Sequence, residues 1–386
     1  MEGLEKGCEL EYIYTYKKEP SYFGRVNMQG SHPIKESSIE IIAPERLVFE
    51  IKPYNFETKV TDTVINGKRI AATTLQETPA LEDEKYASYG VNLKRVEYKL
   101  SYNTSGSKGV RLFTWNEMAK RIYTGYTSYS EKELNKIDGL IKQNSWDKLA
   151  GDEEKVIAIE NFLKKNFATR EDIESEDAFN IEFIIKNKLA SHKGIMRLYG
   201  AIFQQLKISF QFVFVCDRDD CIIDKNFENW NNCESPIFYF PSLNKFIAPT
   251  RIEYRYPYIH PSWAAANGLY CKGTTIGNFT TAIAEVKMVP LEDFSKNFNN
   301  IESTIQLNPG NDTLLIDMKQ LYGGYESVYY RAAYNFASAD EQKSLTKELI
   351  KFGTNSENVV SSEILNREIE SSASGKPFVL HANVKA

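Results

Sequence analysis

The spacing of apolar residues changes twice along this chain, and each change marks a different kind of structure. Up to about residue 105 apolar side chains fall on alternate positions, as at Leu47, Phe49 and Ile51, which is the period of a strand with one buried face. From Trp115 the period becomes helical, and from about Ile301 it is again that of strands. Because 386 residues exceed one ordinary hydrophobic core, we expect roughly two to three domains.

Residues 1–110 are predicted to form an antiparallel β-sandwich. The first alternating stretch consists of Leu10, Tyr12, Tyr14 and Tyr16. A β-branched run further along leads into Asn66-Gly67, a strong hairpin-turn signal, and no long helical pattern interrupts the region. An aromatic fraction of 13% also favours extensive β structure.

Residues 111–295 are predicted to form an α+β domain, because a helical block is followed by strands. The longest helical stripe consists of Ile195, Tyr199, Ile202 and Leu206. Buried strands are expected at residues 210–215, 237–240 and 245–247.

Residues 296–386 again show the period of strands, at 314–316, 328–330 and 378–384, with one helix expected at 339–352. We interpret this region as a second β-sandwich. The predicted fold class is therefore α+β and multi-domain, with a sandwich on each side of an α+β core.

Composition excludes several function classes. A net charge of -5 without basic clusters gives no electrostatic footprint for nucleic acid, and no stretch reaches the roughly 20 apolar residues that span a bilayer. Cys216, Cys221 and Cys233 cluster in the sequence, but a metal site needs a fourth ligand that no nearby histidine supplies. We therefore expect ordinary free thiols, no metal and no cofactor.

Three segments carry a resemblance to a known family. They are Phe113-Thr-Trp115-Asn-Glu, the helix from His192 to Leu206-Lys207-Ile208, and Ile237-Phe-Tyr-Phe-Pro followed by Lys245-Phe-Ile-Ala-Pro-Thr250. The chain resembles bacterial (Bacteroides-type) proteins of unknown function in which a β-sandwich precedes a transglutaminase-like, papain-like core and another sandwich follows. The resemblance spans most of the chain and implies the same architecture here.

In that fold a cysteine at the helix N-terminus, a histidine on the next strand and an aspartate beyond it form the catalytic triad. The resemblance places these positions at His192, Ser235 (within one residue) and Ala248. No cysteine lies between Cys8 and Cys216, and residues 224–240 contain no histidine. We therefore expect a degenerate, catalytically inactive core.

An inactive core predicts a binding or scaffold module for a peptide, protein or glycan. Besides His192, the residues expected at its cleft are Ser191, Trp230, Glu234, Tyr254 and Trp263. Ser191 is placed to cap the helix, and His192 is either a ligand contact or a solvated capping residue. The aromatic Tyr254 and Trp263 either line a cleft or pack under a long connection.

Two alternatives remain open. One is a cysteine enzyme with relocated residues, for example Cys233 with His260, and the other is a purely architectural spacer. Members of the family usually begin with a signal peptide and further strands of the first sandwich. The resemblance therefore implies a partial chain, opening within that sandwich and ending inside a strand, whose parent is extracytoplasmic, in the periplasm or at the cell surface.

Overall fold

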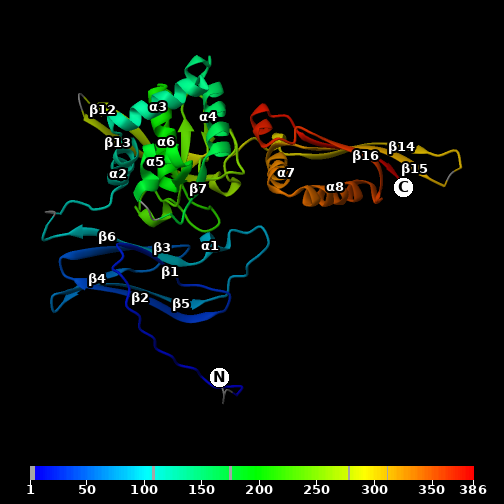
Figure 1. The fold of residues 1–386 in the computed structure, drawn as a ribbon. Helices are drawn as coiled ribbons and strands as arrows, with labels where there is room; N and C mark the ends of the chain where they lie inside the picture. Colours follow the sequence, from blue (N-terminus) through cyan, green and yellow to red (C-terminus); the bar gives the residue numbers. More distant parts are fainter. Residues whose placement is uncertain (1–4, 107–108, 174–175, 277–278, 311) are drawn as a thin grey trace.

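The structure is a computed structural model that describes residues 5–106, 109–173, 176–276, 279–310 and 312–386. It contains several antiparallel sheets, and helices accompany those of the central and C-terminal regions (Figure 1). The predicted class, α+β with several domains, is confirmed. Among the described residues no helix combines the length and the apolar character needed to cross a bilayer.

The N-terminal region forms two three-stranded sheets. One has the order β1 (Phe23–Asn27), β6 (Arg95–Asn103), β3 (Leu47–Tyr54), and the other the order β2 (Ile34–Pro44), β5 (Lys68–Thr78), β4 (Thr61–Ile65). Asn66 and Gly67, with φ of 50° and 73°, turn the chain between β4 and β5, so the predicted hairpin is confirmed. Residues 10–16 are extended but pair with no described strand, contrary to the prediction.

The central region is built on a five-stranded sheet. Its order is β11 (Lys245–Ile247), β10 (Ser235–Phe240), β9 (Gln211–Val215), β12 (Ala266–Ile276), β13 (Phe279–Val289). Around it lie α2 (Trp115–Thr127), α3 (Glu131–Asn144), α4 (Asp152–Asn166), α5 (Ile181–Asn187) and α6 (His192–Gln205). Short elements are α1 (Tyr89–Asn92) and the parallel pair β7 (Ala168–Arg170) and β8 (Leu189–Ser191).

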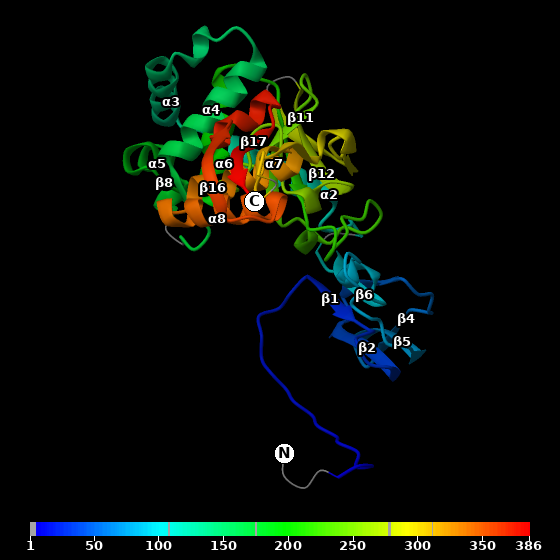
Figure 2. The same ribbon diagram turned by 90° about the vertical axis from the view of Figure 1, so that its right-hand side faces the viewer.

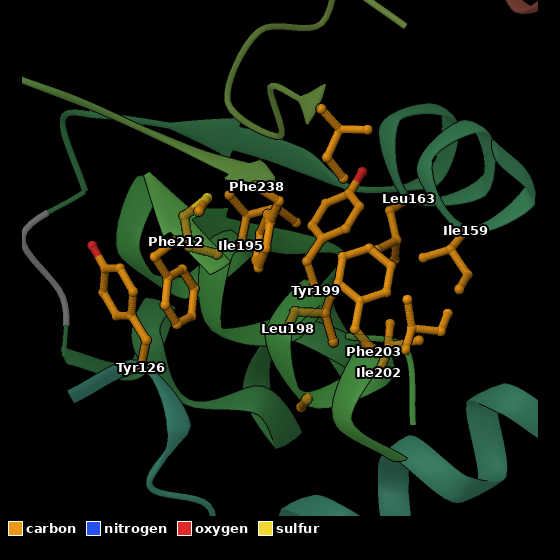
Figure 3. Close-up of a cluster of buried hydrophobic side chains, with 14 of the residues drawn as sticks. Tyr126, Ile159, Leu163, Ile195, Leu198, Tyr199, Ile202, Phe203, Phe212 and Phe238 are labelled. Carbon is orange, nitrogen blue, oxygen red and sulfur yellow. The ribbon is translucent and has the colours of Figure 1, made fainter. Parts of the chain in front are cut away.

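Alternate side chains of the central strands point to opposite faces of the sheet. Phe212 and Phe238 pack against Tyr199 and Phe203 of α6 (Figure 3). Their strand neighbours Val213 and Ile237 belong to a second apolar cluster on the other face. Both clusters are fully buried at these positions, so α6 is fixed by the larger core and the sheet has two distinct faces.

Residues 216–234, which connect β9 to β10, pack against the first sheet of the sandwich. Glu228 accepts hydrogen bonds from Lys99 Nζ at 2.8 Å and from Arg111 Nη2 at 2.8 Å. Glu97 accepts them from Nδ2 of Asn229 at 2.8 Å and of Asn232 at 3.0 Å. Glu97 and Lys99 are completely buried, so the sandwich and the central sheet are joined by a charged interface.

The same segment corrects two expectations. Cys216 and Cys221 form a disulfide, so these two are not free thiols. Trp230 stacks on Phe23 of β1 with ring centroids 5.8 Å apart and meets Phe113 edge-on at 5.2 Å. This tryptophan therefore belongs to the contact with the sandwich rather than to a ligand cleft, because apolar rings of β1 and of the chain before α2 surround it.

The C-terminal region differs from the expected second sandwich. One antiparallel sheet, in the order β14 (Asn299–Leu307), β15 (Leu314–Tyr322), β17 (Phe378–Lys385), β16 (Asn358–Leu365), carries α7 (Gly324–Phe336) and α8 (Ala339–Thr354) on one face. The helix predicted at 339–352 is confirmed as α8. Residues 328–330, predicted as a strand from the period of the region, lie in α7, where Val328, Arg331 and Tyr334 are buried at helical spacing.

We predict that Glu228→Ala lowers the free energy of unfolding by about 3–5 kcal/mol, because it leaves the buried Lys99 without its carboxylate. Urea denaturation at neutral pH measures the change. Asp172→Ala is the matched control, since its pair with Arg170 is solvent-exposed, and this variant should unfold like the parent. Equal effects of the two substitutions would contradict the role given to the charged interface.

Candidate functional site

A cleft of about 1150 Å³ opens at the N-terminus of α6. Its apolar lining consists of Tyr126, Ile173, Phe179, Phe214 and Pro236. Its polar lining consists of Ser130, Glu133, Glu171, Asn180, Ser191, His192, Lys193, Arg197, Cys233 and Glu234. Three of the residues predicted at a cleft, Ser191, His192 and Glu234, are therefore brought together here.

The first turn of α6 is held in place by Ser191 and Gly194. Ser191 Oγ accepts a hydrogen bond from Gly194 N at 3.0 Å and donates one to the carbonyl of Ala178 at 3.1 Å, so the predicted N-cap is confirmed. A Cβ on Gly194 would lie 2.0 Å from that same carbonyl oxygen. The helix can begin so close to residue 178 only because position 194 has no side chain.

The ion pair between Arg197 of α6 and Glu133 of α3 lies under the cleft. Arg197 Nη1 donates to Glu133 Oε1 at 2.6 Å, and Arg197 also contacts the rings of Tyr129 and Phe179. Glu133 in turn accepts hydrogen bonds from the backbone N–H groups of Ser130 and Ile181. Three separate elements are thus fixed to one carboxylate.

The protonation state of Glu133 follows from these contacts. Burial alone would raise the pKa of this carboxyl, but the hydrogen bonds from Arg197, Ser130 and Ile181 stabilise the anion and lower its pKa to about 2. The buried carboxylate therefore remains charged at neutral pH, and its pair with Arg197 serves as structural support for the cleft.

The register of β10 and β11 decides which of their side chains face α6. Ser235 pairs with Val215 of the cluster on the far face, and Ala248 is buried in that same cluster. Pro236 lines the cleft and Ile247 is buried in the core beneath α6. The structure therefore does not bring Ser235 and Ala248 together with His192, and neither residue at the inward-facing positions carries an imidazole or a carboxylate.

Cys233 is a cleft residue that the sequence suggested only as part of another pair. It immediately precedes Glu234 and β10, and lines the same cleft as His192. Burial, followed by the proximity of Cys271 and Glu234, raises the pKa of the Cys233 thiol well above its ordinary value. The raised pKa favours the protonated thiol, and among the described residues no hydrogen bond joins Cys233 to His192.

Glu234 gives this end of the cleft an acidic character. Burial raises the pKa of its carboxyl, and the nearby carboxylates of Asp220 and Asp217 raise it further. Both aspartates lie directly after β9, in the connection to β10, so this connection adds negative charge beside the cleft. Among the described residues no three histidine, cysteine or acidic side chains converge in the manner of a metal site.

Tyr254, Trp263 and His260 form a separate cluster. The His260 ring lies 5.7 Å from that of Tyr254 and 5.6 Å from that of Trp263, and Trp263 is buried on the far face of the sheet. His260 Nδ1 is 2.6 Å from Ser262 Oγ, which donates to Asp217 Oδ2. The aromatic pair therefore packs under the long connection, and Cys233 and His260 lie against different faces of the sheet.

No protein-family model matches the chain, and no curated protein matches it. The crystal structure of a putative protease from Parabacteroides distasonis is similar over 94% of this chain and 76% of that chain, with 9% sequence identity and a TM-score of 0.47. At that identity and TM-score the similarity carries no argument about what this chain does.

We predict that Gly194→Ala destabilises the fold by about 2–3 kcal/mol, because the added methyl group must displace the carbonyl of residue 178. The control is Gly139→Ala in α3, where nothing lies within 4 Å and where alanine should stabilise the helix by about 1 kcal/mol. Thermal unfolding of both variants measures the difference, and the same sign for both would contradict the close approach.

The lowered pKa of Glu133 predicts a pH dependence. Because the folded-state pKa of about 2 lies below the ordinary value of 4.5, the ion pair stabilises the fold above pH 4.5, and this contribution is lost as the pH falls towards 2. Glu133→Gln should therefore cost about 2–3 kcal/mol at pH 7 and less at pH 3. Denaturation at several pH values measures it; a pH-independent cost would contradict the assignment.

Proposed function

We propose that the protein is a catalytically inactive transglutaminase-like module that binds an extended peptide segment of another protein in the cleft beside α6. The observation that carries the proposal is the open cleft itself, which has apolar walls and charged groups but no activated nucleophile. An architectural spacer has no need of such a cleft, so its openness favours binding.

The absence of a usable triad supports inactivity. The first turn of α6 offers His192 where the family carries its thiol. The inward-facing residues next to Ser235 and Ala248 are Pro236 and Ile247. A Cys-His-Asp mechanism needs a thiolate, a proton acceptor and a group that orients the acceptor. The positions expected to supply these groups do not supply them.

The lining supports a peptide ligand. Phe179 and Phe214 suit apolar side chains, while Lys193 and Glu234 offer opposite charges to a polar backbone and its side chains. The cleft volume of about 1150 Å³ also lies just above the range of small-molecule pockets, which is roughly 300–1,000 Å³. A polymer segment uses this space better than a small metabolite does.

We propose that the protein is extracytoplasmic, in the periplasm or at the cell surface. The resemblance to exported bacterial proteins suggested this location, and the disulfide between Cys216 and Cys221 supports it, because disulfides persist in oxidising compartments. Alkylation and mass measurement of the protein isolated from its cells would test it; two free thiols at these positions would contradict it.

A phage-displayed random peptide library tests the binding proposal. We expect selected peptides to bind the parent chain, and Glu234→Arg together with Phe179→Ala to weaken their binding at least about 10-fold. Glu302→Arg on the exposed strand β14 is the control and should leave affinity unchanged. Failure to select peptides, alongside binding of soluble glycans that the same cleft variants abolish, would replace the peptide by a glycan.

A cysteine enzyme is the second candidate, since Cys233, His192 and Glu234 line one cleft. Relative to the family, the imidazole would lie on the helix and the thiol beside the strand. In a Cys8→Ser background, we predict that iodoacetamide labels Cys233 at pH 7 more slowly than a free cysteine, because burial raises the pKa of its thiol. Rapid labelling of Cys233 that is lost in His192→Ala would overturn inactivity and establish the enzyme.

A further inference from the structure

The chain before β1 is an extended segment with an unsatisfied apolar face. Tyr12, Tyr14 and Tyr16 are 73%, 72% and 69% exposed, and Leu10 is 54% exposed. The rings of Tyr12 and Tyr14, and of Tyr14 and Tyr16, stack with centroids 6.0 and 6.1 Å apart, so they lie on one side of the chain. Residues 9–17 thus have the side-chain alternation of a half-buried strand without a sheet to complete it.

The sandwich has an unpaired strand edge, with a groove beside it that could accept such a segment. In the described part of the chain β2 pairs with β5 alone, so its other edge is open. Beside that edge lies a groove of about 420 Å³ in which the inner side chains Val26 of β1, Tyr98 of β6 and Ile39 of β2 are accessible. One additional strand on β2 would extend the second sheet over β1 and β6 and cover these side chains.

We infer that residues 9–17 of a second copy of this chain fill the groove, and that two copies exchange these strands reciprocally. Leu10 and the three tyrosines would face Val26 and Tyr98, while the alternate residues Glu11, Ile13 and Thr15 would face solvent. Complete cover of six tyrosines removes on the order of 1,000 Å² of surface, which is comparable with stable protein interfaces.

The hinge favours a second copy over the chain's own sandwich. Residues 18–21 already line the groove, and the segment before them leads away from the sandwich (Figure 2). Residues 17–22 contain no glycine or asparagine for a tight reversal, and Pro20 restricts Glu19 to extended conformations. If residues 17–22 stay extended, residues 9–17 lie away from their own sandwich and can pair with a neighbouring molecule. This is the geometry of domain swapping.

Sedimentation of the full chain with Cys8→Ser, which removes the exposed thiol of the segment, tests this inference. We expect a dimer at micromolar concentration. Tyr14→Glu should raise the dimer dissociation constant at least about 100-fold, because it places an unpaired charge in the apolar groove. Thr15→Glu, on the opposite side of the strand, should change it less than about 3-fold.

A synthetic peptide of residues 9–18 identifies the occupant. It should bind the monomeric Tyr14→Glu chain saturably, and the same peptide carrying Tyr14→Glu should not bind. A monomeric parent chain at about 100 µM overturns the exchange, and if the peptide still binds the Tyr14→Glu chain, the segment closes on its own sandwich instead. Equal losses from Tyr14→Glu and Thr15→Glu would overturn the assignment of the buried side.

Discussion

The charged interface between β6 and residues 216–234 is the constraint on which the arrangement of the molecule depends. Glu97 and Lys99 are buried there without direct access to water. Each has a hydrogen-bond partner from the central region, and Glu97 also lies 3.6 Å from Arg95 of its own strand. Those partners, Asn229 and Glu228, lie on the chain that ends at Cys233 and Glu234 in the cleft wall. The position of one wall of the cleft is therefore set by the sandwich, while the opposite wall is set by the pair between Glu133 and Arg197.

The sequence was sufficient where a single period dominates. The change from alternating to helical spacing predicted the α+β class. The stripe around Ile195 and Tyr199 located α6, because a long amphipathic pattern buries its apolar side chains on one face only as a helix. The prediction of a strand at residues 328–330, made from the period of the region, was wrong. Three residues are too short a stretch to separate the two periods, and Val328, Arg331 and Tyr334 are buried at helical spacing. The long hairpin of β12 and β13 carries too little apolar contrast to be recognised.

The site was harder to predict because it depends on register and on contacts between distant elements. A shift of one residue moves every side chain of a strand to the other face, and Ser235 and Ala248 lie on the face away from α6. Trp230 is close to the cleft in sequence, yet it packs on Phe23, which lies more than two hundred residues earlier. His192 and Cys233 share a cleft through tertiary packing that no spacing in the sequence specifies.

The joint between the sandwich and the central sheet has a consequence for dissection of the molecule. A fragment that begins near residue 112 would lose Glu97, Lys99 and Arg111 together. Glu228, Asn229 and Asn232 would then lose their hydrogen-bond partners on the sandwich side. Although the sandwich and the central region have separate sheets, a shared buried polar interface joins them. Truncation at that boundary would remove the contacts that hold residues 216–234. The cleft wall at Cys233 and Glu234 would then be free to shift.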